Sequence, residues 1–549
     1  MTTPTAAATP EGQLPQLFAA HAAARADGDE EGGSAPAAGG SGPLLGQART
    51  VTVVGLRAVG VVVEAHVSQG LPGFHVIGSH GAAAHQAADR VRAALGSLGL
   101  SLPARKVLVS LAPADVPKVG ARFDLAMAVA VLGALGAVGE EALRSTALLG
   151  ELALDGRLRA VPGVLPAAAS LPPHGVRRLL VPESNAAEAA LVRDLDVAGV
   201  RDLHEALAVL RGDARPRPVP PPAVPPEDEE LPDLADVRGQ TEARRALEVA
   251  AAGGHHLLLL GPPGCGKSML ARRLPSVLPP LSPDEALELA AVRSVAGRLV
   301  AGAPLVDHRP PFRSPHHSVS TAALLGGGTG IAGPGELSLA HRGILFLDEL
   351  YEWPRGVLDT LRQPLEEGVV RVARSRATVT YPCRIQLISA ANPCRCGGGP
   401  ACACGEDAIW AYRSRLSGPL ADRLDLAPTV APLTAAELLD PDGGEPTAAV
   451  RERVALARAA AAGRWGGPMR NADAPVRAVR RTATSAALRT LALAVDTGQL
   501  TGRGYDRTLR VARTCADLEG ATLVARDHVL EARAHRAALP DAAAIPRTR

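Results

Sequence analysis

The sequence predicts an α/β protein made of two α/β domains and a helical C-terminal region. Short β-branched runs alternate with helical stretches over residues 46–211, and apolar strand patterns alternate with helices again over 232–430. Helical periodicity then dominates residues 431–549. Such alternation is typical of sheets with crossover helices, and a chain of 549 residues is long enough for several domains.

Residues 1–45 differ from the rest of the chain, since they hold mostly Ala, Gly, Pro and acidic residues. A segment with so few large apolar groups does not bury enough surface to offset the entropy of ordering, so we expect a disordered tail. No basic stretch followed by an apolar core occurs in Met1–Pro10. We therefore expect no signal peptide and a cytoplasmic protein.

Charge gives little guidance on partners. The chain has 55 Arg and 3 Lys against 56 acidic residues, a net charge of +2, so any nucleic-acid contact must come from local basic patches. The longest uncharged apolar run, Leu125–Gly139, is 15 residues long. This is shorter than the roughly 18 to 20 residues that span a bilayer, and it predicts a buried helix and no membrane contact.

The first domain is predicted over 46–211, with a helix at Ala82–Leu95 and strands at Val51–Val54, Val59–Val67, Val107–Leu111 and Leu179–Val181. Seven prolines follow between Ala214 and Glu230. This composition favours an extended, semi-rigid chain, so residues 212–231 are predicted to be a linker.

A phosphate-binding loop is predicted after the apolar strand 257–260 and before a helix. Its residues are Gly261, Pro262, Pro263, Gly264, Cys265, Gly266, Lys267 and Ser268. Glycines let backbone N–H groups face the phosphates, Lys267 reaches the β and γ oxygens, and the Ser268 hydroxyl can ligate Mg²⁺. The pattern predicts ATP and Mg²⁺ as cofactors, and a Gly-rich turn at a helix start is the alternative.

Two further strands end in polar residues. Strand 344–347 runs into Asp348 and Glu349, which would hold Mg²⁺ through water and polarise the attacking water, respectively. An acidic pair at a strand end also occurs without such a role. Strand 385–389 leads to Asn392, which places an amide where ligands of open α/β sheets bind.

Four cysteines and two histidines could carry further chemistry. Cys394, Cys396, Cys402 and Cys404 lie in a Gly-rich stretch, where four thiolates can close a tetrahedral Zn²⁺ site; reduced thiols or a redox switch are alternatives. His316 and His317 are interpreted as surface or packing residues, with contact to a substrate as the alternative.

These motifs together give the chain a family resemblance. Residues 232–540 resemble an AAA+ ATPase of the magnesium-chelatase-like group, and the whole chain resembles the YifB/ComM family. The matching stretches are 261–268, 345–350, 391–393, 412–425 and the insertion 311–317. The family also has a cysteine-rich loop after the asparagine, here 394–404.

The resemblance implies roles for three more residues. Asn392 would be the sensor that orients water, Arg423 the arginine finger that enters a neighbouring subunit's site, and Arg503 the second sensor. For Arg423, an ion pair with Asp422 or Asp425 is the alternative. If Arg503 is not the second sensor, the nearby candidates for that role are Arg507, Arg510 and Arg513. The family further implies a homo-hexamer that acts on single-stranded or branched DNA as a branch-migration helicase.

The resemblance also defines the domains. It implies an AAA+ core at 232–430 and a helical lid within 431–549, preceded by a domain at 46–211 that resembles the Lon-protease domain, of the ribosomal S5 domain 2-like fold. Stretches 112–125 and 150–157 carry this likeness. The Ser–Lys dyad of Lon is absent, since Arg122–Asp124 and Val164–Pro166 stand at those places, so we expect no protease and a role in ring assembly or substrate docking.

Local basic residues are the candidate DNA contacts. They are Arg371, Arg374 and Arg376, and Arg477, Arg480 and Arg481, and either set could be a solvated face. Two other functions stay open: a chelatase-type ATPase that remodels a protein, and an ATP-switched scaffold.

Overall fold

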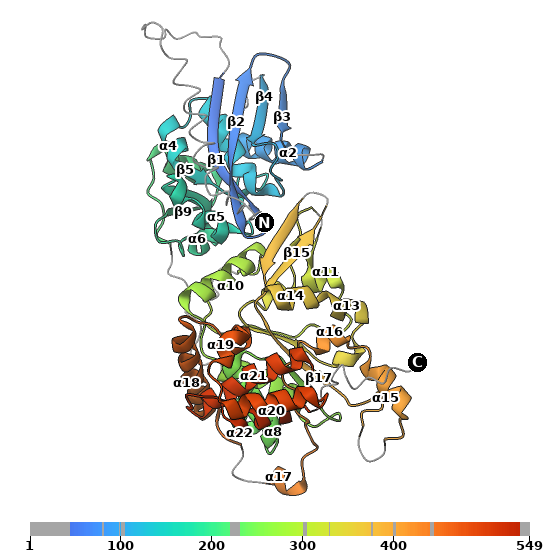
Figure 1. Ribbon diagram of the computed structural model, residues 1–549. Coiled ribbons are helices and arrows are strands. Elements are labelled where there is room, and N and C mark those ends of the chain that lie inside the picture. The colour runs from blue at the N-terminus through green and yellow to red at the C-terminus, as the bar shows by residue number, and fades with distance from the viewer. Residues whose placement is uncertain are drawn as a thin grey trace, which may run out of the picture.

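The computed structural model describes residues 44–78, 82–97, 99, 105–219, 231–299, 305–328, 330–374, 377–398, 402–439 and 444–537. The predictions made for residues 1–43 of the tail, 220–230 of the linker and Arg376 lie outside these ranges. The described chain forms a front α/β domain and a second α/β body with helices at its C-terminal end (Figure 1). The mixed α/β class is therefore confirmed.

The front domain is a seven-stranded sheet in the order β3-β4-β2-β1-β5-β8-β9. Its strands are β1 (Leu44–Val54), β2 (Arg57–Ser68), β3 (Gly73–Ile77), β4 (Lys106–Ala112), β5 (Thr146–Leu148), β8 (Arg178–Pro182) and β9 (Asp196–Val200). Leu44 and Leu45 pair with Val67 and His66 in the β1–β2 ladder. The predicted boundary of the tail at residue 45 is therefore two residues too late.

Helices and a small hairpin complete this domain: α2 (Ala82–Ser97), α3 (Asp124–Ala134), α4 (Glu140–Ser145), α5 (Val164–Ala169), α6 (Glu183–Ala189), α7 (Leu203–Arg211), β6 (Glu151–Leu152) and β7 (Leu158–Arg159). Helix α3 is the buried helix predicted from the apolar run, and it packs in one core with β1 and β2. Asp124 at its start is buried and bonded to Arg90, 2.7 Å from Oδ2 to Nε, and burial raises its pKa to about 6.

The second body is built on a four-stranded parallel sheet in the order β10-β17-β14-β11. The strands are β10 (Leu257–Leu260), β11 (Phe312–Arg313), β14 (Ile344–Leu347) and β17 (Gln386–Ala391). Beyond β10, isolated bridges join Leu257 to Leu426 and Leu260 to Thr429. Residues 426–429 therefore run parallel to β10, and the amino end of β10 lies beside Leu426.

Helices and hairpins surround this sheet: α8 (Thr241–Gly253), α9 (Lys267–Val277), α11 (Thr321–Leu325), α12 (Glu336–Leu339), α13 (Arg355–Thr360), α14 (Arg362–Glu367), α15 (Glu406–Arg413), α16 (Gly418–Ala421), α17 (Ala435–Leu439), β12 (Gly326–Gly327), β13 (Gly333–Pro334), β15 (Val369–Ala373) and β16 (Thr378–Pro382). Strand β11 and the β15–β16 hairpin are not among the sequence predictions. Phe312 of β11 stacks on Phe346 of β14, with ring centroids 5.7 Å apart.

The C-terminal part is helical, as predicted: α18 (Thr447–Trp465), α19 (Val476–Arg480), α20 (Ser485–Asp496), α21 (Gly502–Leu518) and α22 (Arg526–Ala534). Buried side chains of α18, α20, α21 and α22 share one continuous core with α8, α9 and β10. Helix α22 ends at Ala534, and residues 535–537 form a turn.

Helix α10 (Pro283–Val295) connects the two bodies. Ser282 and Glu285 form a capping box at its start, and Arg342, just before β14, pairs with Glu285 at 3.0 Å. At its other end, the Ser294 carbonyl accepts from Gly163 N at 2.9 Å, and Ser294 Oγ donates to the buried Glu188 of α6. Helix α10 thus links the front domain to the core (Figure 1), and the β1–β2 turn adds a second contact, since a Cβ on Gly55 would lie 2.8 Å from Val379 of β16.

Candidate functional site

The carboxyl end of β10 continues into the predicted phosphate loop. Gly264 and Gly266 have φ values of 78° and 92°, and a Cβ on Gly261 would lie 2.1 Å from the Val430 carbonyl oxygen, so glycine is required there. Lys267 begins α9 and is 8% exposed. Its Nζ donates to the Gly261 and Pro262 carbonyl oxygens, each at 2.7 Å. The ammonium therefore lies inside the loop with neutral acceptors only, so it is available to a phosphate.

Two predicted residues, Asn392 and Asp348, meet the loop at the same sheet edge. Asn392 follows β17, and its Oδ1 accepts from Lys267 Nζ at 3.1 Å. Ser268 Oγ donates to Asp348 Oδ2 at 2.8 Å. A hydroxyl and a carboxylate oxygen this close are the hard ligands that Mg²⁺ prefers, so these two residues fit the ion.

Glu349 follows Asp348 with a left-handed backbone, φ 51°. This conformation is costly for a residue with a side chain, and it is held by Glu352 N donating to Glu349 O at 2.7 Å. The Glu349 carboxylate is 55% exposed, and its Oε2 lies 3.3 Å from Nδ1 of His317. His317 belongs to the segment after β11, a fourth strand end on this edge.

Arg423 and Arg503 lie at the opposite edge of the sheet. Asp425 N donates to His256 O at the amino end of β10, which places the segment 422–425 there. Arg503 pairs with Asp422 at 3.3 Å, and Arg423 is 7% exposed and paired with Glu366. Arg423 therefore forms an ion pair within the chain, as the alternative proposed, but with Glu366 and not with Asp422 or Asp425.

A buried ion pair fixes this amino edge. Arg507 of α21 donates to Asp425 Oδ1 at 2.6 Å. Burial alone would raise the pKa of Asp425, but Arg507 and His255 hold it well below its ordinary value. The pair anchors α21 beside Arg423, so Arg503 and Arg423 share one surface away from the chain's own phosphate loop.

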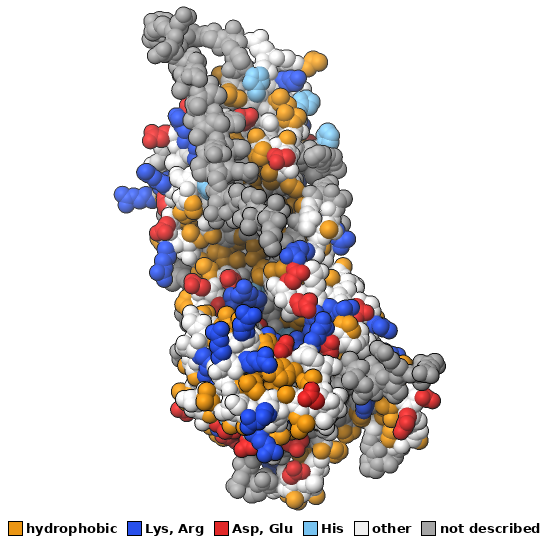
Figure 2. Space-filling view, in the orientation of Figure 1, with side chains coloured by type: hydrophobic (Ala, Val, Ile, Leu, Met, Phe, Trp, Pro, Cys, Tyr) orange, Lys and Arg blue, Asp and Glu red, His pale blue; other side chains and the backbone are white. Residues whose placement is uncertain are grey.

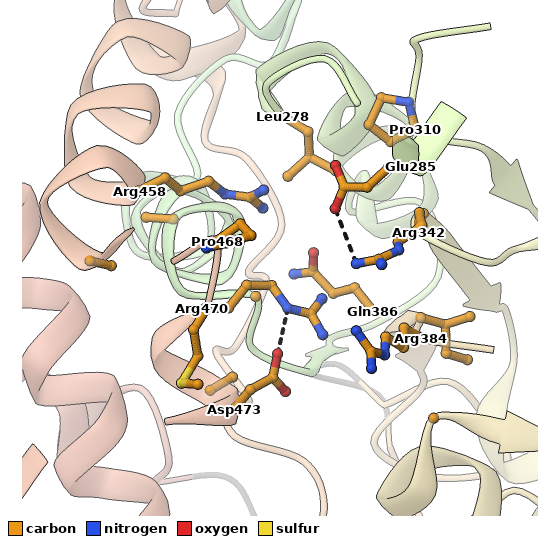
Figure 3. A pocket seen from close by; sticks show the side chains of 18 of the residues that line it. Leu278, Glu285, Pro310, Arg342, Arg384, Gln386, Arg458, Pro468, Arg470 and Asp473 are labelled. Atoms are coloured by element: carbon orange, nitrogen blue, oxygen red, sulfur yellow. Dashed lines mark hydrogen bonds and ion pairs between the residues drawn. The ribbon is translucent and has the colours of Figure 1, made fainter. Parts of the chain in front are cut away.

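A cleft of about 860 Å³ opens on the same amino side, between α18 and the starts of β14 and β17 (Figure 3). Arg458, Arg470 and Arg384 point into it, as does Gln386, the first residue of β17. Asp473 pairs with Arg470 at 2.8 Å and Glu285 with Arg342 at 3.0 Å. Positive and negative groups are both present, so the lining favours no single ligand charge.

The four predicted cysteines lie together. Their Sγ atoms all fall within 4.8 Å of one another, and Cys394 Sγ is 3.2 Å from Cys396 Sγ and 3.5 Å from Cys402 Sγ. Tetrahedral Zn²⁺ with bonds of about 2.3 Å needs sulfurs roughly 3.8 Å apart, so the cluster fits zinc closely. Gly397, inside this loop, packs against Pro263 of the phosphate loop, since a Cβ there would lie 2.8 Å from Pro263 Cδ.

The predicted basic sets lie on two separate elements. Arg371 and Arg374 are exposed on or beside the β15–β16 hairpin, and Arg371 pairs with Glu367. Arg477 and Arg480 lie on α19, followed by Arg481, and Arg480 covers the Tyr505 ring at 5.7 Å. On the visible face of the core and the C-terminal helices, basic and acidic side chains are intermingled, without one large basic field (Figure 2).

Sequence patterns alone do not give the pairing of His317 with Glu349, the joint position of Arg423 and Arg503, or the contact of the cysteine loop with Pro263. The pairing of His317 with Glu349 could be found from the register offset between β11 and β14. However, β11 is a strand of two residues beside Pro310 and Pro311, so it has no periodicity to detect. Among the described residues, no helix is both long and apolar enough to cross a membrane.

One edge of the parallel sheet is closed by a phosphate loop, an Asp–Glu pair and an asparagine, and helices pack behind it. This combination defines an AAA+-type ATPase class. Three family models match this chain: "Magnesium chelatase, subunit ChlI" over residues 233–438, "Subunit ChlI of Mg-chelatase" over 63–185, and "Magnesium chelatase, subunit ChlI C-terminal" over 444–536.

Relatives match along most of the chain. A Mycobacterium tuberculosis protein is 48% identical over 500 residues, 90% of this chain and 98% of its own length. YifB of Escherichia coli is 41% identical, covering 89% of this chain and 96% of YifB, and competence protein ComM of Haemophilus influenzae is 40% identical, covering 88% and 96%. The chain belongs to the YifB/ComM family of magnesium-chelatase-like proteins.

Proposed function

We propose that the chain is a Mg²⁺-dependent ATPase that assembles as a hexameric ring and moves DNA. One observation carries the ring: Lys267 and Glu349 lie at the carboxyl edge of the sheet, whereas Arg423 and Arg503 lie at its amino edge. Each chain therefore presents two half-sites that face different ways. A complete site needs the amino edge of a second copy.

Binding begins at the phosphate loop. The backbone N–H groups of 264–268 and the Lys267 ammonium hold the β and γ phosphates, and the ammonium exchanges its bonds to Gly261 O and Pro262 O for phosphate oxygens. Ser268 and Asp348 would hold Mg²⁺, which supplies neutralisation of phosphate charge when bound.

Hydrolysis uses the residues beside the loop. Glu349 accepts a proton from water, the water oxygen bonds to the γ phosphorus, and the bond from that phosphorus to the bridging oxygen breaks, so ADP leaves with the electron pair. Asn392 orients the water. Arg423 and Arg503 of the neighbouring subunit neutralise the charge that develops on the γ phosphoryl group, so turnover depends on assembly.

The cysteine cluster is proposed to hold one structural Zn²⁺. All four thiolates would be ligands, which leaves no open position for a catalytic water. Because Gly397 of this loop packs on Pro263, the closed cluster would stiffen one wall of the phosphate loop. Zinc analysis of the purified protein tests this proposal.

DNA is the proposed substrate, and two observations support it. The H. influenzae relative is named a competence protein. In addition, the β15–β16 hairpin presents Arg371 and Arg374 on an exposed element that stands out from the sheet (Figure 1). The match to magnesium chelatase favours a second candidate, remodelling of a protein partner by the same ATPase.

The deciding experiment measures ATP hydrolysis without DNA and with single-stranded, duplex and forked DNA, together with unwinding of the forked substrate. Stimulation and unwinding by the native chain, both lost in Lys267→Ala, support the motor. Hydrolysis that no DNA raises, with no unwinding, removes the DNA proposal and favours protein remodelling. Full hydrolysis by Lys267→Ala would refute the site itself.

A further inference from the structure

We propose that Arg536, two residues beyond the end of α22, is a positioning residue for Arg423, because it holds the backbone from which Arg423 projects at the amino edge of the sheet. This inference rests on the proposed function, in which Arg423 acts on a neighbouring subunit. Its starting observation is a pair of hydrogen bonds. Arg536 Nη1 donates to Leu424 O at 2.9 Å and to Asp425 O at 2.8 Å.

The backbone around Arg423 is a short connection between two regular elements. Helix α16 ends at Ala421, and the first bridge to β10 is made by Leu426. Arg423 N and Leu424 N donate back to carbonyl groups of α16, each at 3.0 Å. The two carbonyl groups that accept from Arg536 lie before the bridge. Their hydrogen bonds therefore come from the turn after α22 and not from the sheet.

These bonds are made in a buried environment. Arg536 is 8% exposed, and Leu424 and Asp425 are 1% and 3% exposed. A charged donor makes stronger hydrogen bonds than a neutral one, and its removal would leave two buried carbonyl oxygens without a partner. Beside them, Ala427 N donates to the His535 carbonyl oxygen at 2.6 Å. The turn 535–537 thus holds the stretch 424–427 along its length.

The side chain of Asp425 gives this stretch a second attachment. Its Oδ1 accepts from Arg507 of α21 at 2.6 Å, and its Oδ2 accepts from His256 N at 2.9 Å. The attachment through Asp425 fixes one side chain, whereas Arg536 fixes the main chain on both sides of the peptide bond between Leu424 and Asp425. Loss of Arg536 would therefore let the main chain next to Arg423 shift while α21 stays in place.

The Arg423 side chain has few contacts that could hold it independently of its backbone. One guanidinium nitrogen donates to Pro419 O at 2.6 Å, and another pairs with Glu366, whose side chain is 61% exposed. Nε of Arg423 is buried and has no hydrogen-bond partner among the described residues. The direction of the guanidinium thus depends on the backbone that Arg536 holds.

The first test measures steady-state ATP hydrolysis and fluorescent nucleotide binding. We expect Arg536→Ala to lower kcat about 10- to 100-fold, because misplacement of a catalytic group by about 1 Å costs up to about 10²-fold. The dissociation constant for the nucleotide should stay native, since the phosphate loop is untouched. Arg536→Lys should recover part of kcat, because one nitrogen makes both native bonds. Arg526→Ala, an exposed arginine at the start of α22, is the control and should match the native chain.

The second test mixes subunits and gives a result that a loss of stability alone would not produce. Arg536→Ala mixed with Lys267→Ala should hydrolyse ATP faster than either variant alone, because the intact carboxyl edge of the first can meet the intact amino edge of the second. Arg536→Ala mixed with Arg423→Ala should recover no rate, since both variants lack a working amino edge.

Native kcat in Arg536→Ala, or a loss of nucleotide binding as large as the loss of kcat, would overturn the proposal. If the melting curve shows that Arg536→Ala does not fold, Arg536→Lys decides: reduced kcat with native nucleotide binding supports the proposal, and native kcat overturns it. Failure of the proposed function is distinguishable, because the mixture of Arg423→Ala with Lys267→Ala would then recover no rate either. Recovery in that mixture alone would refute only the role of Arg536.

Discussion

The two edges of the central sheet are built in opposite ways. The carboxyl edge gathers residues from four consecutive strand ends, including Lys267, Asp348 and Asn392, and its key groups bond to backbone or to one another. The arginines at the amino edge are buried or ion-paired. Arg423 pairs with Glu366, and Arg507 pairs with Asp425. Under the proposed function, one edge would bind the phosphates and the other would supply positive charge.

Under the proposed function, this difference means that the charge balance of the reaction would be divided between copies of the chain. The carboxyl edge supplies one ammonium near the phosphates, which alone does not match a triphosphate and its transition state. The amino edge has the guanidinium groups, yet it lies at the far ends of the same strands. The following substitutions test this division of roles between the two edges.

Arg423→Ala should have the largest effect, a loss in kcat of about 10³-fold, because an arginine finger stabilises transition-state charge. Binding of a nucleotide should stay native. Mixing Arg423→Ala with Lys267→Ala subunits should restore part of the hydrolysis, since the two variants carry complementary intact edges. Arg355→Ala, an exposed arginine on α13, is the matched control, and failure of the mixture to recover any rate would break the comparison.

Glu349→Gln should lower kcat by about 10²- to 10³-fold and leave nucleotide affinity native, because the amide still fits but takes no proton from water. Single-turnover hydrolysis and fluorescent nucleotide binding measure the two quantities separately. A parallel loss of both would mean that Glu349 supports the loop and is not the base.

Cys396→Ser should lower zinc content from about one equivalent to below a tenth, because a weaker ligand replaces one of four thiolates. The dissociation constant for ATP should rise about fivefold, equal to about 1 kcal/mol of lost positioning of the phosphate loop. Re-addition of zinc to chelated native protein is the control. Native zinc content in the variant would contradict the ligand set.

Glu531→Gln should lower the free energy of unfolding at pH 7 by about 1–2 kcal/mol. Burial alone would raise the pKa of Glu531, but bonds from His535 and Arg245 lower it to about 2. Because the folded pKa lies below the ordinary value of 4.5, this stability is present above about pH 5 and is lost as the pH falls toward 2.

Denaturant melts at pH 7 and pH 3 measure this change, with the exposed Glu452→Gln on α18 as control. Arg245 lies on α8 and Glu531 on α22, joined at 2.7 Å, so the pair reports how firmly the C-terminal helices hold the amino edge. A pH-independent difference would contradict the assigned ion pair.

The sequence predicts the carboxyl edge better than the amino edge. Strands β10 and β14 are uninterrupted apolar runs, and β17 is a buried run with Gln386 and Ser389 in it. Recognisable polar residues follow all three strands, so each motif could be placed without a structure. The meeting of Arg423 with Arg503 depends on where α21 docks. Arg507, which pairs with Asp425 82 positions away, and the buried side chains of α21 in the shared core hold the helix there, and no local pattern encodes that docking.

Short elements are also hard to predict. β11 has two residues and lies beside prolines, so no alternation of apolar and polar residues indicates a strand. It is defined only by its pairing with β14. The cysteine spacing predicts a cluster, yet its contact with Pro263 depends on the glycines at 397 and 398, whose positive φ values fold the loop back. The Lon-like character of the front domain and the roles assigned to Arg423, Arg503 and zinc stay predictions.

Helix α10 gives the molecule a lever. It is rooted at the strand that carries Asp348, through Glu285 and Arg342, and its far end is locked to Glu188 of the front domain. Its 13 residues make an arm of about 20 Å, so a tilt of about 10° at the amino edge of the sheet moves the far end by about 3 Å. A movement of β14 would therefore reach Glu188 of the front domain through this helix.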